Sequence, residues 1–274
     1  MTLRWGLLGA GMIAERFARD LAFSAGGKPA VVASRDLGRA QPLAARCLPL
    51  MAQIESEITS GSLGRITQIQ GSLGFAWQES QGDPITDPAL GGGALLDLGV
   101  YGLSLVHQLL GAPTTLSAEV AYAASGSVRD AVVLLRHDRE IGPVLSTVRV
   151  SHSTNLPNRF EIQGTSGTLI IDAPFIVAET ARQGMFAARQ RSAPSAPNPV
   201  IARLQRTQYW PTVKRILRRV IGEPGKRIRA PYPGSGLQFE ADAFARCLSD
   251  NLSDCPQVPL DASIAVLDIL DQVR

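Results

Sequence analysis

The first residues that could do chemistry are an acid and a phenol one helical turn apart. Residues 91–111 open with three glycines and continue as a mostly apolar stretch, which predicts a helix. Asp97 and Tyr101 stand at i and i+4 in this stretch, so their side chains share one face. A tyrosine can give a proton to a carbonyl oxygen, and a carboxylate one turn earlier can orient the substrate or the phenol. Alternatively, Asp97 stabilises the first turn of the helix and Tyr101 belongs to the core.

A second group, near the N-terminus, could hold a phosphate-bearing ligand. Residues 3–8 predict a short buried strand, and residues 9–14 follow it with the pattern G-x-G-x-x-A. The first small residue permits a tight turn, the second lets the backbone approach a pyrophosphate, and the third lets the next helix lie close to the strand. We expect a dinucleotide here rather than a plain glycine turn, with the helix N-terminus at its phosphates. The expected contacts are Gly9, Gly11, Met12, Ile13 and Ala14.

The residues after the next strand, 30–33, bear on which dinucleotide binds. An acidic residue commonly follows this strand when the ligand is NAD, because it accepts hydrogen bonds from the ribose hydroxyl. Ser34 and Arg35 come first here, and a hydroxyl and a guanidinium suit a 2′-phosphate better. Arg39, one turn into the following helix, can assist. We therefore expect NADP(H) in preference to NAD(H), unless Arg35 is simply a solvated loop charge.

The positive charge of the chain is concentrated in one segment. The net charge is +3, yet residues 182–229 hold 12 of the 27 basic residues and one of the 24 acids. The rest of the chain is therefore acidic, and its pI gives no reason to expect nucleic-acid binding. Residues 182–200 predict a loop, and 212–221 predict a short helix with one apolar and one basic face. This helix could contact an anionic membrane surface or RNA; we expect it to cap its own domain instead.

Length and composition predict a globular protein with one large domain or two. No uninterrupted run of 18 apolar residues is present, and charged residues interrupt any signal-peptide core near the N-terminus. The three cysteines lack metal-type spacing. We expect a cytoplasmic protein with reduced thiols.

Most of the remaining chain predicts strands. A helix is expected over residues 48–60, and another over about 37–47. Several successive antiparallel strands imply an open sheet with helices on one face and the other face free. A free apolar face is generally covered by a second copy, so we expect a homodimer through this sheet. The predicted strands are 65–77, 115–123, 129–136, 144–151, 159–164 and 167–172, the last two forming a hairpin.

Taken together, these motifs resemble the Gfo/Idh/MocA family of NAD(P)-dependent oxidoreductases, in its dihydrodiol and sugar dehydrogenase branch. The resemblance implies a Rossmann domain, a C-terminal domain with an open sheet, and hydride transfer between nicotinamide and a small polyol, aldose or dihydrodiol. It also implies that Tyr101 is the acid/base residue and Asp97 its companion. The residues that carry it lie at 9–14, 33–36, 91–101, 160–167, 239–241 and 259–263.

The chain departs from the family in its nucleotide domain. The family's Glu-Lys-Pro motif is missing, and the only lysines are Lys28, Lys214 and Lys226. The family pattern breaks between residues 47 and 48, as though about 70 to 90 residues were removed. We therefore expect an α/β protein with a truncated Rossmann-like unit over 1–47, followed over 48–274 by an α+β domain with a large open, mostly antiparallel sheet and a basic insertion at 182–229. Activity should be impaired; the alternative is a non-catalytic, sheet-dimerising relative with a vestigial nucleotide loop.

Overall fold

The computed structural model describes residues 3–8, 12–33, 47–78, 82–186 and 225–273, together with a few single residues between 203 and 213. The expected helix over 37–47 lies outside these ranges. So does the helix expected over 212–221, apart from its first two residues.

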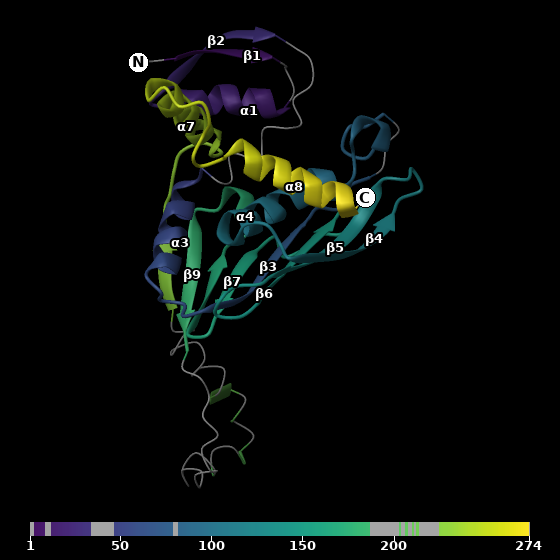
Figure 1. The fold of residues 1–274 in the computed structure, drawn as a ribbon, viewed down its shortest axis with the longest axis vertical. Helices are drawn as coiled ribbons and strands as arrows, with labels where there is room; N and C mark the ends of the chain where they lie inside the picture. The colour runs from purple at the N-terminus through teal and green to yellow at the C-terminus, as the bar shows by residue number, and fades with distance from the viewer. Residues whose placement is uncertain are drawn as a thin grey trace.

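The N-terminal part has the expected order of strand, helix and strand. Strand β1 (Leu3–Leu8) leads to helix α1 (Met12–Asp20), the short turn η1 (Leu21–Phe23) and strand β2 (Gly27–Ala33). The two strands pair in parallel, and in the described residues no third strand joins them. Figure 1 shows this unit in purple, apart from the large sheet.

A late helix packs on this N-terminal unit. Helix α7 (Leu237–Ser249) lies against α1, η1 and β2. The Asp20 carboxylate accepts hydrogen bonds from both the backbone amide and the hydroxyl of Ser235, just before α7. Further along, the ring of Phe244 lies 5.4 Å from that of Trp5. The chain therefore returns to its first elements after completing the large sheet.

The large sheet contains eight strands, and all neighbouring pairs are antiparallel except β3 with β6. The order across the sheet is β10-β9-β8-β7-β3-β6-β5-β4. The six expected strands are present with ends shifted by a few residues. The strands are β3 (Ile66–Gly74), β4 (Thr115–Tyr122), β5 (Val128–His137), β6 (Val144–Ser151), β7 (Phe160–Gly164), β8 (Gly167–Ile171), β9 (Thr180–Met185) and β10 (Gly225–Arg229).

Strands β9 and β10 correct the interpretation of the basic segment. Residues 182–185 were expected in a loop, but they complete β9, and β10 pairs with it from the far end of the segment. The inward positions of β9 include Ala181 and Gln183, which are 0% and 3% exposed. Small and polar residues at buried positions give no apolar alternation, so the pattern concealed the strand.

Helices cover one face of the sheet. The main core is formed by inward side chains of the strands and by side chains of four helical elements. These elements are helix α3 (Pro49–Thr59), the π-helical turn η3 (Leu95–Gly99), helix α4 (Val100–Leu110) and helix α8 (Leu260–Val273). Figure 1 shows α4 between the strands and α8. On the opposite face Val132, Leu134 and Leu145 are 39 to 50% exposed. In the part of the chain that the structure describes, the sheet therefore has one helix-covered face and one face with exposed apolar side chains, as the sequence predicts.

Close packing explains one unusual glycine in α4. A Cβ atom at Gly102 would lie 2.8 Å from Cγ1 of Val148 on β6. The helix therefore approaches the sheet closely at this point, and a side chain would force the two apart.

The run Pro88–Leu110 is long and apolar enough to cross a membrane by length and composition, although it contains Asp97. However, 67% of its most apolar window is buried inside the protein. Such burial is what a core helix on a sheet requires.

Candidate functional site

Asp97 is paired with a histidine that follows a strand of the large sheet. Its side chain is 40% exposed, and its Oδ2 lies 3.1 Å from Nε2 of His152. His152 directly follows β6 and is 6% exposed. Asp97 itself lies in the π-helical turn η3, a local widening that is frequent at functional sites. A carboxylate fixed by an imidazole can hold a hydroxyl or a neighbouring phenol in a defined orientation.

Tyr101 follows one turn later, in α4, and is 4% exposed. Burial, and then the nearby carboxylate of Asp97, raise the pKa of its phenol well above the usual value. The phenol is therefore protonated at every ordinary pH. In that form it can donate a proton, but it cannot accept one.

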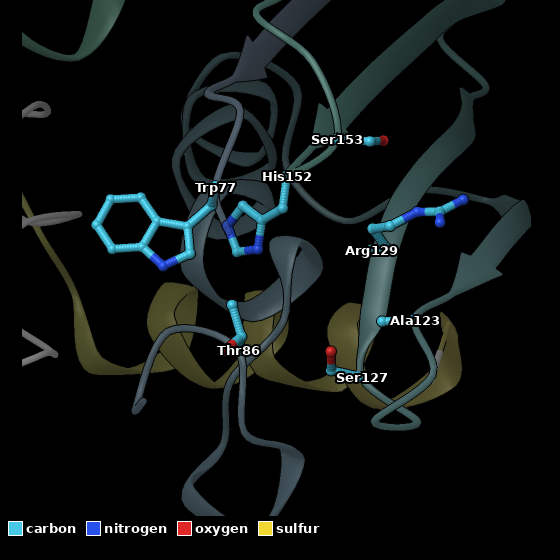
Figure 2. Close-up of a pocket in the computed structure, with 7 residues that line it drawn as sticks. All are labelled: Trp77, Thr86, Ala123, Ser127, Arg129, His152 and Ser153. Carbon is cyan, nitrogen blue, oxygen red and sulfur yellow. The ribbon is translucent and has the colours of Figure 1, made fainter. Parts of the chain in front are cut away.

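A pocket of about 300 Å³ opens beside His152. Its walls come from the segment after β3, the loop before η3, the β4–β5 turn and the end of β6. Figure 2 shows the imidazole of His152 beside the indole of Trp77, with the side chain of Thr86 below the imidazole. The lining residues are Trp77, Thr86, Ala123, Ser127, Arg129, His152 and Ser153.

Both basic side chains of this pocket face a carboxylate. Nε of Arg129 donates a hydrogen bond to the carboxylate of Asp130 at 3.0 Å. The second basic side chain, His152, contacts the carboxylate of Asp97. Burial raises the pKa of Asp130, but hydrogen bonds from Ser151, Ser153 and Arg129 outweigh it, and the pKa is lowered. Asp130 is therefore charged near neutral pH. The pocket offers hydrogen-bond donors with little net charge.

Comparison with known proteins identifies the domain that contains these residues. Residues 51–170 match the GFO/IDH/MocA C-terminal domain. They form a GFO/IDH/MocA C-terminal domain. They include strands β3 to β7, the π-helical turn and α4, and hence Asp97, Tyr101, His152 and every residue that lines the pocket.

Relatives and solved structures extend the similarity beyond this domain. Trans-1,2-dihydrobenzene-1,2-diol dehydrogenase of Mus musculus is 26% identical over 84% of the chain, and the NADP(+)-dependent D-xylose 1-dehydrogenase of Hypocrea jecorina is 23% identical over 83%. The chain spans 59% and 56% of the lengths of these two proteins. A 3-ketoreductase from Actinomadura kijaniata, solved with NADP, shares the fold with a TM-score of 0.65 at 18% identity, over 100% of this chain and 97% of its own.

The loop before Asp97 in the GFO/IDH/MocA domain is tied together by Asp83. Its carboxylate accepts hydrogen bonds from the indole of Trp77 at 2.8 Å and from the amide of Ile85 at 3.0 Å. The carbonyl of Ile85 accepts from Gly93, and the carbonyl of Gly93 accepts from the amide of Asp97. Gly93 has φ +124°, a conformation that favours glycine. The predicted glycine opening of the helix therefore connects the pocket wall to Asp97.

Only part of the expected dinucleotide site lies in the described residues. Met12 begins α1, Ile13 is half-buried, and Ala14 is 4% exposed, which fits the small residue required where the helix meets the strand. The observed strand, helix and parallel strand fit the first βαβ unit of a dinucleotide fold. Gly9, Gly11, Ser34, Arg35 and Arg39 lie outside the described residues, so their roles stay predictions.

The two lysines that the structure describes lie away from Asp97. Lys28 is exposed near the start of β2, and Lys226 on β10 forms an ion pair with Glu57 of α3. Neither lines the pocket. In the described part of the chain no lysine stands in for the one missing from the Glu-Lys-Pro motif.

The sequence pattern paired Asp97 with Tyr101 but gave no sign of His152. His152 is 55 residues from Asp97, and a single histidine after a strand carries no periodic signal. The roles of Asp97 and Tyr101 in a reaction stay predictions.

Proposed function

We propose that the chain is an NADP(H)-dependent oxidoreductase that transfers hydride between nicotinamide and a small polyol, aldose or dihydrodiol. The observation that carries this proposal is the Asp97–His152 pair, one turn before a protonated Tyr101 and beside a pocket of about 300 Å³, inside a GFO/IDH/MocA domain. The dihydrodiol and xylose dehydrogenases among its relatives support the substrate class. When bound, the nicotinamide supplies the hydride at C4.

In this proposal each residue has a separate task. Tyr101 donates its proton to the substrate oxygen during reduction, because its raised pKa keeps the phenol protonated. Asp97, held by His152, orients the substrate hydroxyl and the phenol. Ser34, Arg35 and Arg39 bind the 2′-phosphate of the cofactor, and the amides at the start of α1 face its pyrophosphate.

We also propose that turnover is slow. In the described residues the N-terminal sheet has one strand pair, which leaves little to hold the nicotinamide about 3 to 3.5 Å from the substrate carbon. Good positioning can supply several kcal/mol of a barrier. The missing lysine adds a smaller loss. The same two-stranded sheet favours a second candidate, a non-catalytic relative that dimerises through its large sheet.

Titration with NADPH, followed by cofactor fluorescence, separates the two candidates. Saturable binding supports the oxidoreductase, and no binding at millimolar concentrations supports the non-catalytic relative. NADPH oxidation is then followed with aldoses, dihydrodiols and dicarbonyls as substrates. Slow turnover that is abolished by Tyr101→Phe supports the assigned roles; equal turnover by Tyr101→Phe refutes the role of the phenol.

We propose further that two copies associate through the free face of the sheet. The exposed Val132, Leu134 and Leu145 lie on β5 and β6, the two neighbouring strands beside the edge strand β4. Apolar side chains grouped on a sheet face are stabilised when a second surface removes them from water. A twofold pair would bury the same face of both copies.

A further inference from the structure

Trp77 combines exposure with a fixed orientation, which is unusual for an indole. The side chain lies in the wall of the pocket, and the residue is 45% exposed. Its Nε1 donates to Asp83 at 2.8 Å, and its backbone amide donates to the carbonyl of His152 at 2.8 Å. The preceding amide, of Ala76, donates to Asn155 at 3.0 Å.

These hydrogen bonds fix the position of a large apolar ring that remains partly exposed to solvent. An exposed indole gains little of the stability that burial would give, so its position is not explained by folding alone. The polar edge of the ring is used by Asp83, which leaves the ring faces as the surface available to a ligand.

The rest of the pocket is polar. Hydroxyls of Thr86, Ser127 and Ser153 surround the space beside His152, and Arg129 is already paired with a carboxylate. An apolar platform with hydroxyl groups around it matches a molecule that has a flat C–H face and a rim of hydroxyls. A small saturated or partly saturated ring has this form, whereas an open-chain polyol does not present one fixed apolar face.

We propose that Trp77 is a specificity-determining residue that stacks on the apolar face of a cyclic substrate, a pyranose or a cyclic diol, and disfavours open-chain polyols. The inference rests on the proposed function and narrows its substrate class. A ring is already rigid when it meets the indole, but an open chain must lose rotational freedom to make the same contact. Asp83 is the positioning residue that keeps the indole in place.

Binding of two matched ligands tests this without any hydride transfer. Calorimetry compares 1,5-anhydroglucitol, a ring, with glucitol, its open-chain counterpart. The full chain should bind the ring about tenfold more tightly. Trp77→Leu should remove this preference, while Trp210→Phe, which loses an indole elsewhere, should keep it. Asp83→Ala should weaken the preference and Asp83→Asn, which keeps an acceptor, should retain most of it.

Equal binding of the two ligands, no binding of either, or a preference that persists in Trp77→Leu would overturn the inference. Circular dichroism of each variant shows whether it is folded, and saturation transfer from indole protons to one face of the ring gives a second measurement in the unaltered chain. NADPH turnover tests the proposed function separately from this binding preference. Ring preference without NADPH turnover leaves this inference intact, and NADPH turnover with equal kcat/KM for rings and open chains overturns the inference alone.

Discussion

Replacing Asp20 by alanine should detach α7 from the N-terminal unit. Asp20 is 3% exposed. Its carboxylate accepts hydrogen bonds from the amide of Ser235 at 2.9 Å, from the Ser235 hydroxyl at 2.6 Å and from the amide of Leu237 at 3.0 Å. A hydrogen bond to a charged group contributes about 1.5 to 3 kcal/mol, and an anion at a helix N-terminus gains a further fraction. Because such contributions are not additive, we expect a loss of about 3 to 5 kcal/mol.

Hydrogen exchange measures this loss where it should occur. In Asp20→Ala, amides of residues 3–33 and 237–249 should exchange faster, while those of β5 and β6 keep their protection, because the main core is separate. Asp20→Asn, which keeps one acceptor oxygen, should lie between the two. A loss below about 1 kcal/mol with unchanged exchange in both segments would refute the assignment of Asp20 as the anchor of α7.

Three other substitutions test the packing, the dimer and the cofactor. Gly102→Ala should cost about 1 to 3 kcal/mol and lower the Tm, because the added methyl meets Val148 at 2.8 Å; Gly6→Ala, with nothing within 4 Å, is the matched control. Leu134→Glu should convert a dimer into a monomer in sedimentation, and a wild-type monomer at tens of micromolar would contradict the dimer. Arg35→Ala should weaken binding of NADPH far more than that of NADH, and equal effects would show that Arg35 does not contact the phosphate.

The strands that could be predicted were those whose two faces differ in polarity. β5 and β6 alternate buried and exposed positions along most of their length, and their inward residues are mainly apolar. β9 also alternates, but glutamine and alanine fill its inward positions, so burial there has no hydrophobic signature. Its partner β10 is held mainly by backbone pairing at the edge of the sheet.

The site divides in a similar way between local and distant contacts. Asp97 and Tyr101 are neighbours through helical spacing, which the sequence contains. Trp77 and His152 meet because β3 and β6 form the one parallel pair of the described sheet, with Gly74 opposite Ser151. Parallel strands bring their carboxyl ends to the same edge. That pairing is set by the whole sheet, so residues shortly after two distant strands gave no sign of sharing a pocket.

Because Tyr101 is protonated, the chain should catalyse reduction of a carbonyl substrate better than oxidation of an alcohol substrate near neutral pH. Burial and then the charge of Asp97 raise the pKa of the phenol, so it can give a proton to a substrate oxygen but cannot take one near neutral pH. The oxidation rate should therefore keep rising with pH beyond about 10, the pKa of an unperturbed tyrosine. A folded-state pKa above the unfolded value also contributes stability that is present below about pH 10 and is lost as pH rises further.

Difference absorbance of tyrosinate between the wild type and Tyr101→Phe measures this ionisation directly. The comparison is needed because burial, with the charges of Glu179 and Asp20, also raises the pKa of Tyr232, to about 12. Asp97→Asn should lower the pKa of Tyr101, since it removes the carboxylate charge. If the folded wild type shows an ionisation between about pH 7 and 9 that Tyr101→Phe lacks, the phenol is already activated. In that case a positive group must lie beside it, and the expected weakness in oxidation would be wrong.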